Sequence, residues 1–254
     1  VVVAGSGLLT AYELQTGKPS FFVQGTSCVA NPTPVIGAND TLFVASANPG
    51  PKREFQPDFN ELVSACDKDK DGQLKADELP TGLFQSLFPS MDANQDGTLS
   101  SSEYDRVQEL MGTCTNGMMA IKPGGQGIDR TESNLLWHEK KSIPRTSSPV
   151  YYGGQLYLIN DGGLLACRDG QTGRQLNAVR GPAKGKYFGS AVLGDGKIYC
   201  ANDRGEVTVI AATPELKVLS FAQFEEPIYP SPAISNGRLY LRTESRLFCF
   251  GDEK

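Results

Sequence analysis

Short runs in which apolar and polar residues alternate, separated by glycine-rich turns, occupy most of the chain. The run SSPVYYGGQLYLIND (147–161) returns as GSAVLGDGKIYCAND (189–203) and again as PSPAISNGRLYLRTE (230–244). Anchored on Pro149, Ala191 and Pro232, the copies are spaced by 42 and then 41 residues. Short strands recurring at this period predict a β-propeller with four strands per blade, in preference to a sandwich or another closed meander.

One copy of the repeat is interrupted. Its first half, TPVIGANDTLFVASA (33–47), aligns Pro34 with Pro149, which lies 115 residues further on. The pattern resumes at NGMMAIKPGG (116–125) and ends with SNLLWHEKK (133–141). Because one blade takes about 42 residues, roughly seventy are inserted between its second and third strands. We therefore expect propeller parts at 1–47 and 116–254 and a separate insertion at 48–115.

The strand inventory predicts a partial propeller. Residues 1–25 provide a second, third and fourth strand without a first, and residues 227–250 provide three strands without a fourth. The result is three whole blades and two partial ones, fewer than the common closed rings contain. We interpret this as an all-β propeller whose N-terminal blades lie outside this chain.

The insertion has a helical period and two acidic loops. Loop one is DKDKDGQLKADE (67–78), and loop two is DANQDGTLSSSE (92–103). Both fit the calcium-loop pattern D-x-[DN]-x-[DN]-G-x5-E, and apolar residues at helical spacing flank them. This predicts a small α-helical EF-hand pair. Two solvated Asp-Gly turns without metal are the alternative.

The expected ligands supply oxygen, which Ca²⁺ requires in a shell of six to eight atoms. Side-chain oxygens come from alternate loop positions, a backbone carbonyl comes from the seventh position, and a glutamate closes each loop. Two Ca²⁺ sites are thus predicted, with these ligands: Asp67, Asp69, Asp71, Gln73 and Glu78 in loop one; Asp92, Asn94, Asp96, Thr98 and Glu103 in loop two.

The residues between the ligands suggest that the loops act as a pair. Leu74 and Leu99 occupy the eighth positions, where paired loops meet in a short two-stranded contact. Ser100 and Glu103 form a capping box that begins the last helix. The pair could be a calcium sensor that opens a hydrophobic groove or a structural clip. Pro80 and Pro89 shorten the middle helices and favour the clip.

Composition narrows the choice of partners. The net charge is -5, and no basic cluster suggests binding to nucleic acid. No apolar run approaches the length of a transmembrane segment. The six cysteines have no zinc spacing. Cys167, Cys200 and Cys249 lie in strand patterns and are expected to be buried. A disulfide among Cys28, Cys66 and Cys114 is possible, and the sequence does not indicate which two would pair.

Two turns carry a family resemblance. AYELQTG (11–17) and CRDGQTG (167–173), together with the SSPV and GGQLYL elements, resemble the PQQ-like (quinoprotein-type) β-propeller repeat. Proteins of this type include quinoprotein dehydrogenases and the non-enzymatic propeller lipoprotein of outer-membrane assembly. With an inserted EF-hand pair, the resemblance implies a bacterial protein in an extracytoplasmic setting, either periplasmic or secreted.

The chain departs from the enzymes of this type. Where their repeat has a docking tryptophan, it has Phe21 and Asn177, and it has no pair of adjacent cysteines. Its one tryptophan, Trp137, is followed by its one histidine, His138, which is expected to be a surface residue and not a ligand. PQQ is not expected here. We predict a non-catalytic calcium-binding scaffold or binding module with protein partners. The alternative is a quinoprotein-type, PQQ-dependent dehydrogenase-like enzyme whose active site lies in the missing blades.

Overall fold

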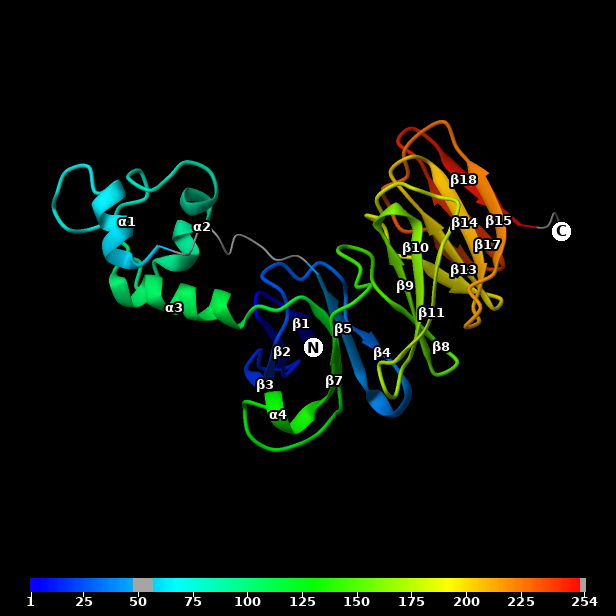
Figure 1. Cartoon of the computed structure of the whole chain (residues 1–254), viewed down its shortest axis with the longest axis horizontal. Coiled ribbons are helices and arrows are strands. Elements are labelled where there is room, and N and C mark those ends of the chain that lie inside the picture. The colour runs from blue at the N-terminus through cyan, green and yellow to red at the C-terminus, as the bar shows by residue number, and fades with distance from the viewer. Residues whose placement is uncertain (48–56, 252–254) are drawn as a thin grey trace.

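The computed structural model describes residues 1–47 and 57–251. In this part of the chain the strands form five antiparallel sheets, three with four strands and two with three. Helices α1, α2 and α3 form a separate lobe beside the first two sheets (Figure 1). The strand pairing therefore has the three whole and two partial units that the repeat predicts.

Each sheet takes its strands in chain order. The first contains β1 (Val2–Ala4), β2 (Leu8–Tyr12) and β3 (Pro19–Gln24). The second contains β4 (Val35–Ile36), β5 (Leu42–Ser46), β6 (Gly117–Ile121) and β7 (Leu135–Glu139). The third contains β8 (Val150–Tyr152), β9 (Gln155–Asn160), β10 (Leu164–Asp169) and β11 (Gln175–Arg180). The fourth contains β12 (Val192–Gly194), β13 (Lys197–Ala201), β14 (Glu206–Ala211) and β15 (Val218–Gln223), and the fifth contains β16 (Ala233–Ser235), β17 (Arg238–Arg242) and β18 (Leu247–Phe250). Short helices η1 (Ala38–Asp40), α4 (Thr131–Asn134) and η2 (Asp161–Gly163) lie between strands.

Tight turns explain why the first two strands pair as hairpins in the third, fourth and fifth sheets. Gly153-Gly154, Asp195-Gly196 and Asn236-Gly237 each have positive φ at both residues. A two-residue turn with this backbone matches the right-handed twist of the strands it joins, and glycine, asparagine and aspartate adopt it most readily. The GG, DG and NG pairs in the sequence thus set the register of the hairpins.

A β-bulge recurs at one place in every sheet that has an outer strand. The register between the third and fourth strands shifts after Ala11, Ala120, Cys167 and Val209. These residues occupy equivalent positions in the repeat. A bulge increases the local right-handed twist, so each of these sheets has extra twist at the same height.

Neighbouring sheets pack face to face and are also tied by hydroxyl groups. Phe43 and Met118 of the second sheet belong to one buried cluster with Leu156 of the third. The backbone N–H of Ser148 donates to Ser190 Oγ (2.9 Å), and that of Ser190 donates to Ser231 Oγ (2.8 Å). The same bond joins the preceding repeat, because the N–H of Thr33 donates to Ser148 Oγ (2.9 Å). One hydrogen bond per repeat therefore links four successive sheets.

The helical lobe, residues 57–115 in the described part, interrupts the second sheet without breaking it. β5 pairs with β6, and Ser46 lies opposite Gly117. The lobe contains α1 (Phe59–Cys66), α2 (Leu83–Met91) and α3 (Ser101–Thr113), which pack around a core of their own. The lobe thus lies between the second and third strands of a sheet. The first nine residues of the predicted insertion, 48–56, lie outside the described residues.

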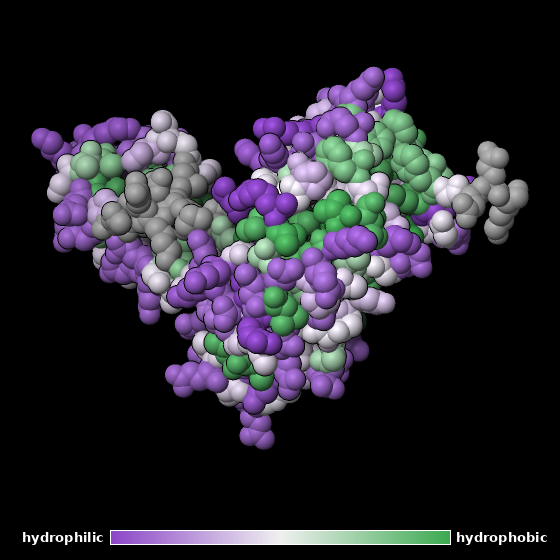
Figure 2. All heavy atoms as spheres, turned by 45° about the vertical axis from the view of Figure 1, so that its right-hand side comes forward, coloured by the Kyte–Doolittle hydropathy of each residue, from purple (hydrophilic) through white to green (hydrophobic). Residues whose placement is uncertain are grey.

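The fifth sheet is more exposed than the apolar pattern of its strands predicts. Large apolar side chains on and beside it face solvent, and Figure 2 shows apolar surface over this end of the molecule. They include Val218, Leu219, Phe221, Ile234, Leu247 and Phe250. Cys249 is exposed, so its predicted burial is wrong, because β18 has no further strand or sheet beside it in the described chain. Cys167 and Cys200 are buried as expected. All six cysteines are free thiols, so no disulfide joins any two of Cys28, Cys66 and Cys114.

The prediction that His138 is a surface residue is also wrong. Its ring is partly buried against Gly117, where a Cβ atom would lie 2.0 Å from His138 Nε2. That nitrogen is buried and has no hydrogen-bond partner in the described structure. Burial, and secondarily the charge of Lys140, lowers the pKa of His138. Alternation along β7 placed this residue outside, but glycine on the adjacent strand leaves room for the ring.

Candidate metal centre

Two capping boxes fix where the helices around the loops begin. Asp58 accepts the backbone N–H of Glu61 (2.8 Å) at the start of α1, and Glu61 accepts the N–H of Asp58 in return. Ser100 and Glu103 make the same reciprocal pair at the start of α3. The second box was predicted. The first was not, although its D-x-x-E spacing at 58–61 carries the same signal.

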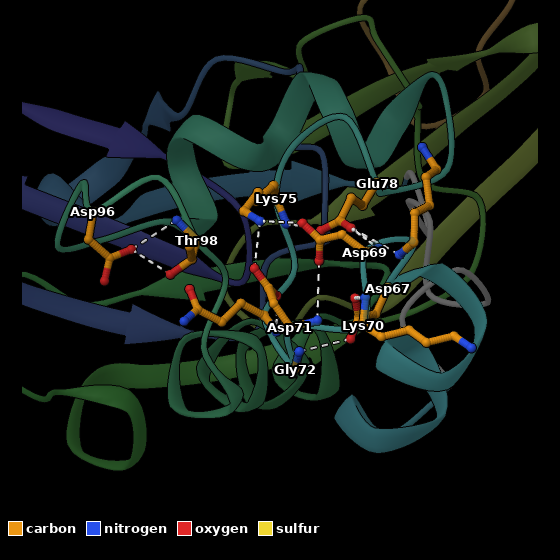
Figure 3. Close-up of polar contacts among 11 residues, drawn as sticks. Asp67, Asp69, Lys70, Asp71, Gly72, Lys75, Glu78, Asp96 and Thr98 are labelled. Carbon is orange, nitrogen blue, oxygen red and sulfur yellow. Dashed lines mark hydrogen bonds and ion pairs between the residues drawn. The ribbon is translucent and has the colours of Figure 1, made fainter.

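Loop one folds around its carboxylates. Asp67 accepts the backbone N–H groups of Lys70 (2.7 Å) and Gly72 (2.9 Å), which bends the chain back on itself (Figure 3). Asp69 and Asp71 follow on the same turn, and one carboxylate oxygen from each of the three aspartates lies within 4.8 Å of the others. The alternate positions proposed as ligands are thus brought together.

Glu78 closes loop one from its far end. Its Oε1 accepts the N–H of Lys68 (2.9 Å), and its Oε2 accepts the N–H of Lys75 (2.9 Å). The side chain is buried against the lobe. The bond to Lys68 holds the carboxylate of Glu78 beside the start of the loop, although the two residues are ten positions apart in sequence.

Loop two repeats this arrangement. Asp92 accepts the N–H groups of Asp96 (3.2 Å) and Gly97 (2.9 Å), and Asn94 Oδ1 also accepts the N–H of Asp96 (3.0 Å). Glu103 Oε1 accepts the N–H of Ala93 (2.8 Å) as Glu78 does that of Lys68. Gly72 and Gly97 have φ of 80° and 85°, so the sixth position of each loop requires the left-handed backbone that glycine adopts without strain.

The two loops are joined at their centres. Leu74 and Leu99 form an antiparallel bridge in which the N–H of Leu99 donates to the carbonyl of Leu74 (2.8 Å). Both side chains are fully buried in the core of the lobe, together with Phe88 and Tyr104. The predicted contact between the eighth positions is present, so the backbones of the two loops are directly hydrogen-bonded to each other.

The electrostatics of both loops favour ionised carboxylates. Backbone N–H donation from Lys75 lowers the pKa of Glu78, and that from Ser100 lowers the pKa of Glu103. The Lys75 side chain lowers the pKa of Asp69, and the Thr98 hydroxyl lowers that of Asp96. These carboxylates are therefore negatively charged at neutral pH.

The donor set fits a hard divalent cation. The side chains at the ligand positions offer carboxylate, amide and hydroxyl oxygens, and the set contains neither histidine nor cysteine. Oxygen-only ligation of this kind suits Ca²⁺ better than zinc or copper. Gln73 and Thr98 are placed by N–H donation to Asp71 (2.8 Å) and Asp96 (2.9 Å), so the seventh residue of each loop adjoins its fifth. Their part as carbonyl ligands stays a prediction.

Sequence reasoning missed how the outer strands contact the next sheet. Trp137 Nε1 donates to the carbonyl of Gly170 (3.1 Å), and its ring lies against Gly173 in the same turn. On the following outer strand Asn177 Nδ2 donates to the carbonyl of Glu215 (3.3 Å). Trp137 and Asn177 occupy the same position beside the recurrent bulge. An amide thus makes the contact with the next turn that the indole makes one repeat earlier.

Comparisons with known proteins give the fold and no family. No family model and no curated protein matches the sequence. The structure is similar to that of BamB from Moraxella catarrhalis, with a TM-score of 0.54 and 10% identity over 98% of this chain and 54% of that one. It is also similar to the computationally designed Ika8 protein, with a TM-score of 0.55 and 7% identity over the same shares. The chain spans about half the length of both. BamB is a β-propeller, so this chain has a propeller-like fold.

The described helices include none that is both long enough and apolar enough to span a membrane. The dehydrogenase-like alternative stays a prediction.

Proposed function

We propose that this protein is a calcium-binding β-propeller that acts as a non-catalytic scaffold or binding module. The observation that carries the proposal is the pairing of two loops of one pattern. In loop one the carboxylates of three aspartates converge, in loop two the backbone folds around Asp92 in the same way, and the loops are joined through Leu74 and Leu99. A single acidic turn would be much weaker support for calcium binding, because isolated carboxylate clusters are common on protein surfaces.

In this proposal each loop holds one Ca²⁺. Loop one would use Asp67, Asp69, Asp71 and Glu78 with the carbonyl of Gln73. Loop two would use Asp92, Asn94, Asp96 and Glu103 with the carbonyl of Thr98. Bound calcium would supply charge neutralisation for carboxylates that otherwise repel one another within a few ångströms. If calcium binds the folded lobe and not the unfolded chain, binding stabilises the folded lobe by mass action.

The position of the lobe supports a role in presentation to a partner. Both of its ends leave one hairpin of the second sheet, and its helices stand beside the sheets instead of between them (Figure 1). We propose that calcium stiffens the lobe, that the lobe is presented to a protein partner, and that the protein works in an extracytoplasmic compartment. Calcium there reaches the millimolar range that matches weak modules of this kind, with dissociation constants of about 10⁻⁴ to 10⁻³ M.

Isothermal titration of the chain with Ca²⁺ tests the proposal. We expect about two sites by analogy with paired loops, and we expect Mg²⁺ to compete weakly. The double variant Glu78→Gln, Glu103→Gln should lose both sites while keeping the helix start, because glutamine also serves at the third position of a capping box.

A matched control removes the same charge elsewhere in the lobe. Glu61 on α1 and Glu109 on α3 lie outside both loops, and their double replacement by glutamine should leave the titration unchanged within about twofold. Equal calcium binding in the loop variant and in this control would refute the assignment of the two closing glutamates as ligands.

A further inference from the structure

The side chain of Lys75 lies where loop one would receive its cation. Lys75 occupies the ninth position of the loop, and its ammonium group turns back across it (Figure 3). Its Nζ is 2.7 Å from Asp69 Oδ2 and 2.6 Å from Asp71 Oδ2. Two of the carboxylates proposed as ligands are thus bridged by a positive charge that the chain itself supplies.

Loop two has no counterpart to this bridge. Its ninth position is Ser100, whose hydroxyl donates to Glu103 Oε2 (2.7 Å). The carboxylate at the fifth position, Asp96, instead accepts the amide of Asn94 (2.8 Å) and the hydroxyl of Thr98 (2.8 Å). These neutral donors leave the negative charge of loop two uncompensated. The loops therefore agree in pattern and differ in what faces their carboxylates.

The other two lysines of loop one do not contact its carboxylates. Lys68 Nζ donates to the carbonyl of Asp77. Lys70 lies at the left-handed position of the turn, with φ of 60°, and no hydrogen bond or ion pair of its ammonium group occurs within the described residues. Lys75 therefore differs from the other two lysines because its ammonium group contacts the carboxylates of the loop.

We propose that Lys75 is a built-in competitor for calcium in loop one, so that loop two fills first and loop one fills only when the ammonium group is displaced. This inference rests on the proposed function. A group tethered by a few bonds acts at an effective concentration of millimolar order or above. It therefore competes well with calcium in the weak extracellular range.

The contact between Leu74 and Leu99 makes this order of filling matter. Lys75 directly follows Leu74, whose carbonyl accepts the N–H of Leu99. Filling of loop two therefore acts on the residue next to the competing lysine, and release of Lys75 gives loop one a second, higher threshold. One lobe would then respond at two calcium concentrations.

The test isolates loop one and removes the lysine. In a Glu103→Gln background, which silences loop two, calcium titration reports on loop one alone. Lys75→Met removes the ammonium group at similar length, and Lys75→Ser copies loop two. Because exposed ion pairs are individually weak, we expect each change to tighten loop one by about fivefold to tenfold. In the Lys75-containing chain, side-chain nitrogen NMR should show that calcium frees the Lys75 ammonium group.

Lys70→Met is the matched control, since it removes the same charge from the same loop. We expect it to alter affinity by less than about twofold because salt screens charges that make no contact. Equal tightening by Lys70→Met and Lys75→Met would overturn the proposal in favour of a general charge effect. Calcium binding to loop one that is unchanged in both Lys75 variants would overturn it while leaving the proposed function intact. Absence of calcium binding in every variant, and in the unaltered chain, would refute the proposed function and this inference with it.

Discussion

Arg168 is the largest side chain that is fully buried, and its replacement should weaken the contact between the second and third sheets. Its Nη1 donates to the carbonyl of Gly173 (2.8 Å), and its Nη2 donates to that of Lys141. Glu139 lies 3.7 Å away as an ion-pair partner. Arg168 therefore joins the turn of its own sheet to the segment that leaves β7.

The cost of Arg168→Met follows from these partners. The carbonyl of Gly173 would be left buried without its donor, which costs about 1–3 kcal/mol. The bond to Lys141 is partly open to water, so its loss costs about 1 kcal/mol. Methionine keeps most of the apolar stem, and removal of the unpaired Nε recovers part of the loss. The half-exposed Glu139 contributes little. We expect the free energy of unfolding to fall by about 2–3 kcal/mol.

The assay follows from the position of Trp137. It is the single tryptophan of the chain, and it packs against the same turn that Arg168 holds. Denaturant unfolding should be followed by tryptophan fluorescence and by far-ultraviolet circular dichroism, with Arg174→Met as the control. Arg174 is exposed, so its replacement should alter stability by less than about 0.5 kcal/mol. A loss below about 1 kcal/mol in Arg168→Met would show that the buried bonds do not carry the stability assigned to them.

Two further predictions concern the second sheet. Because Ser46 lies opposite Gly117, replacing 48–115 by a Gly-Asn turn in the intact protein should leave the sheets folded, and loss of the β circular-dichroism signal would contradict this. His138 has a lowered pKa, so the unfolded chain takes up its proton first, near pH 6.5. Its stabilising contribution is complete above that pH and is lost as the pH falls from there through the lower pKa of the folded state. Between pH 7.5 and 5.5 the melting temperature should therefore fall further in the unaltered chain than in His138→Gln, and equal falls would contradict the prediction.

The sequence predicted the features that depend on local pattern. The repeats and the turn glycines located the sheets, because strand pairing in a hairpin is set by neighbours in sequence. The change from alternating apolar residues to a helical period located the lobe. The contact between Leu74 and Leu99 was predictable for a similar reason, since the eighth position of each loop is fixed by the loop itself. The identity of the bound ion stays a prediction.

What the sequence left out depends on contacts between elements. Arg168 directly follows the apolar run LLAC in β10, and a charged residue at that place was the available signal for a buried bond. The reach of Lys75 across loop one depends on a side-chain rotamer, which spacing does not determine. His138 and Cys249 were misplaced for opposite reasons. A glycine on the next strand makes room for the histidine ring, and the outer strand that would cover the cysteine is absent from the described sheet.

The pairing of Ser46 with Gly117 also bears on how quickly the molecule can fold. About seventy residues must be gathered before these two strands meet, and closing a loop costs more entropy as it lengthens. A lobe that has already folded ties Pro57 to α3 through Tyr104 and Gln108, which shortens the stretch of chain that must be closed when the two strands pair. Topology of this kind governs folding rates more than stability. Any ligand that folds the lobe early would thus act on the sheets as an accelerator of assembly.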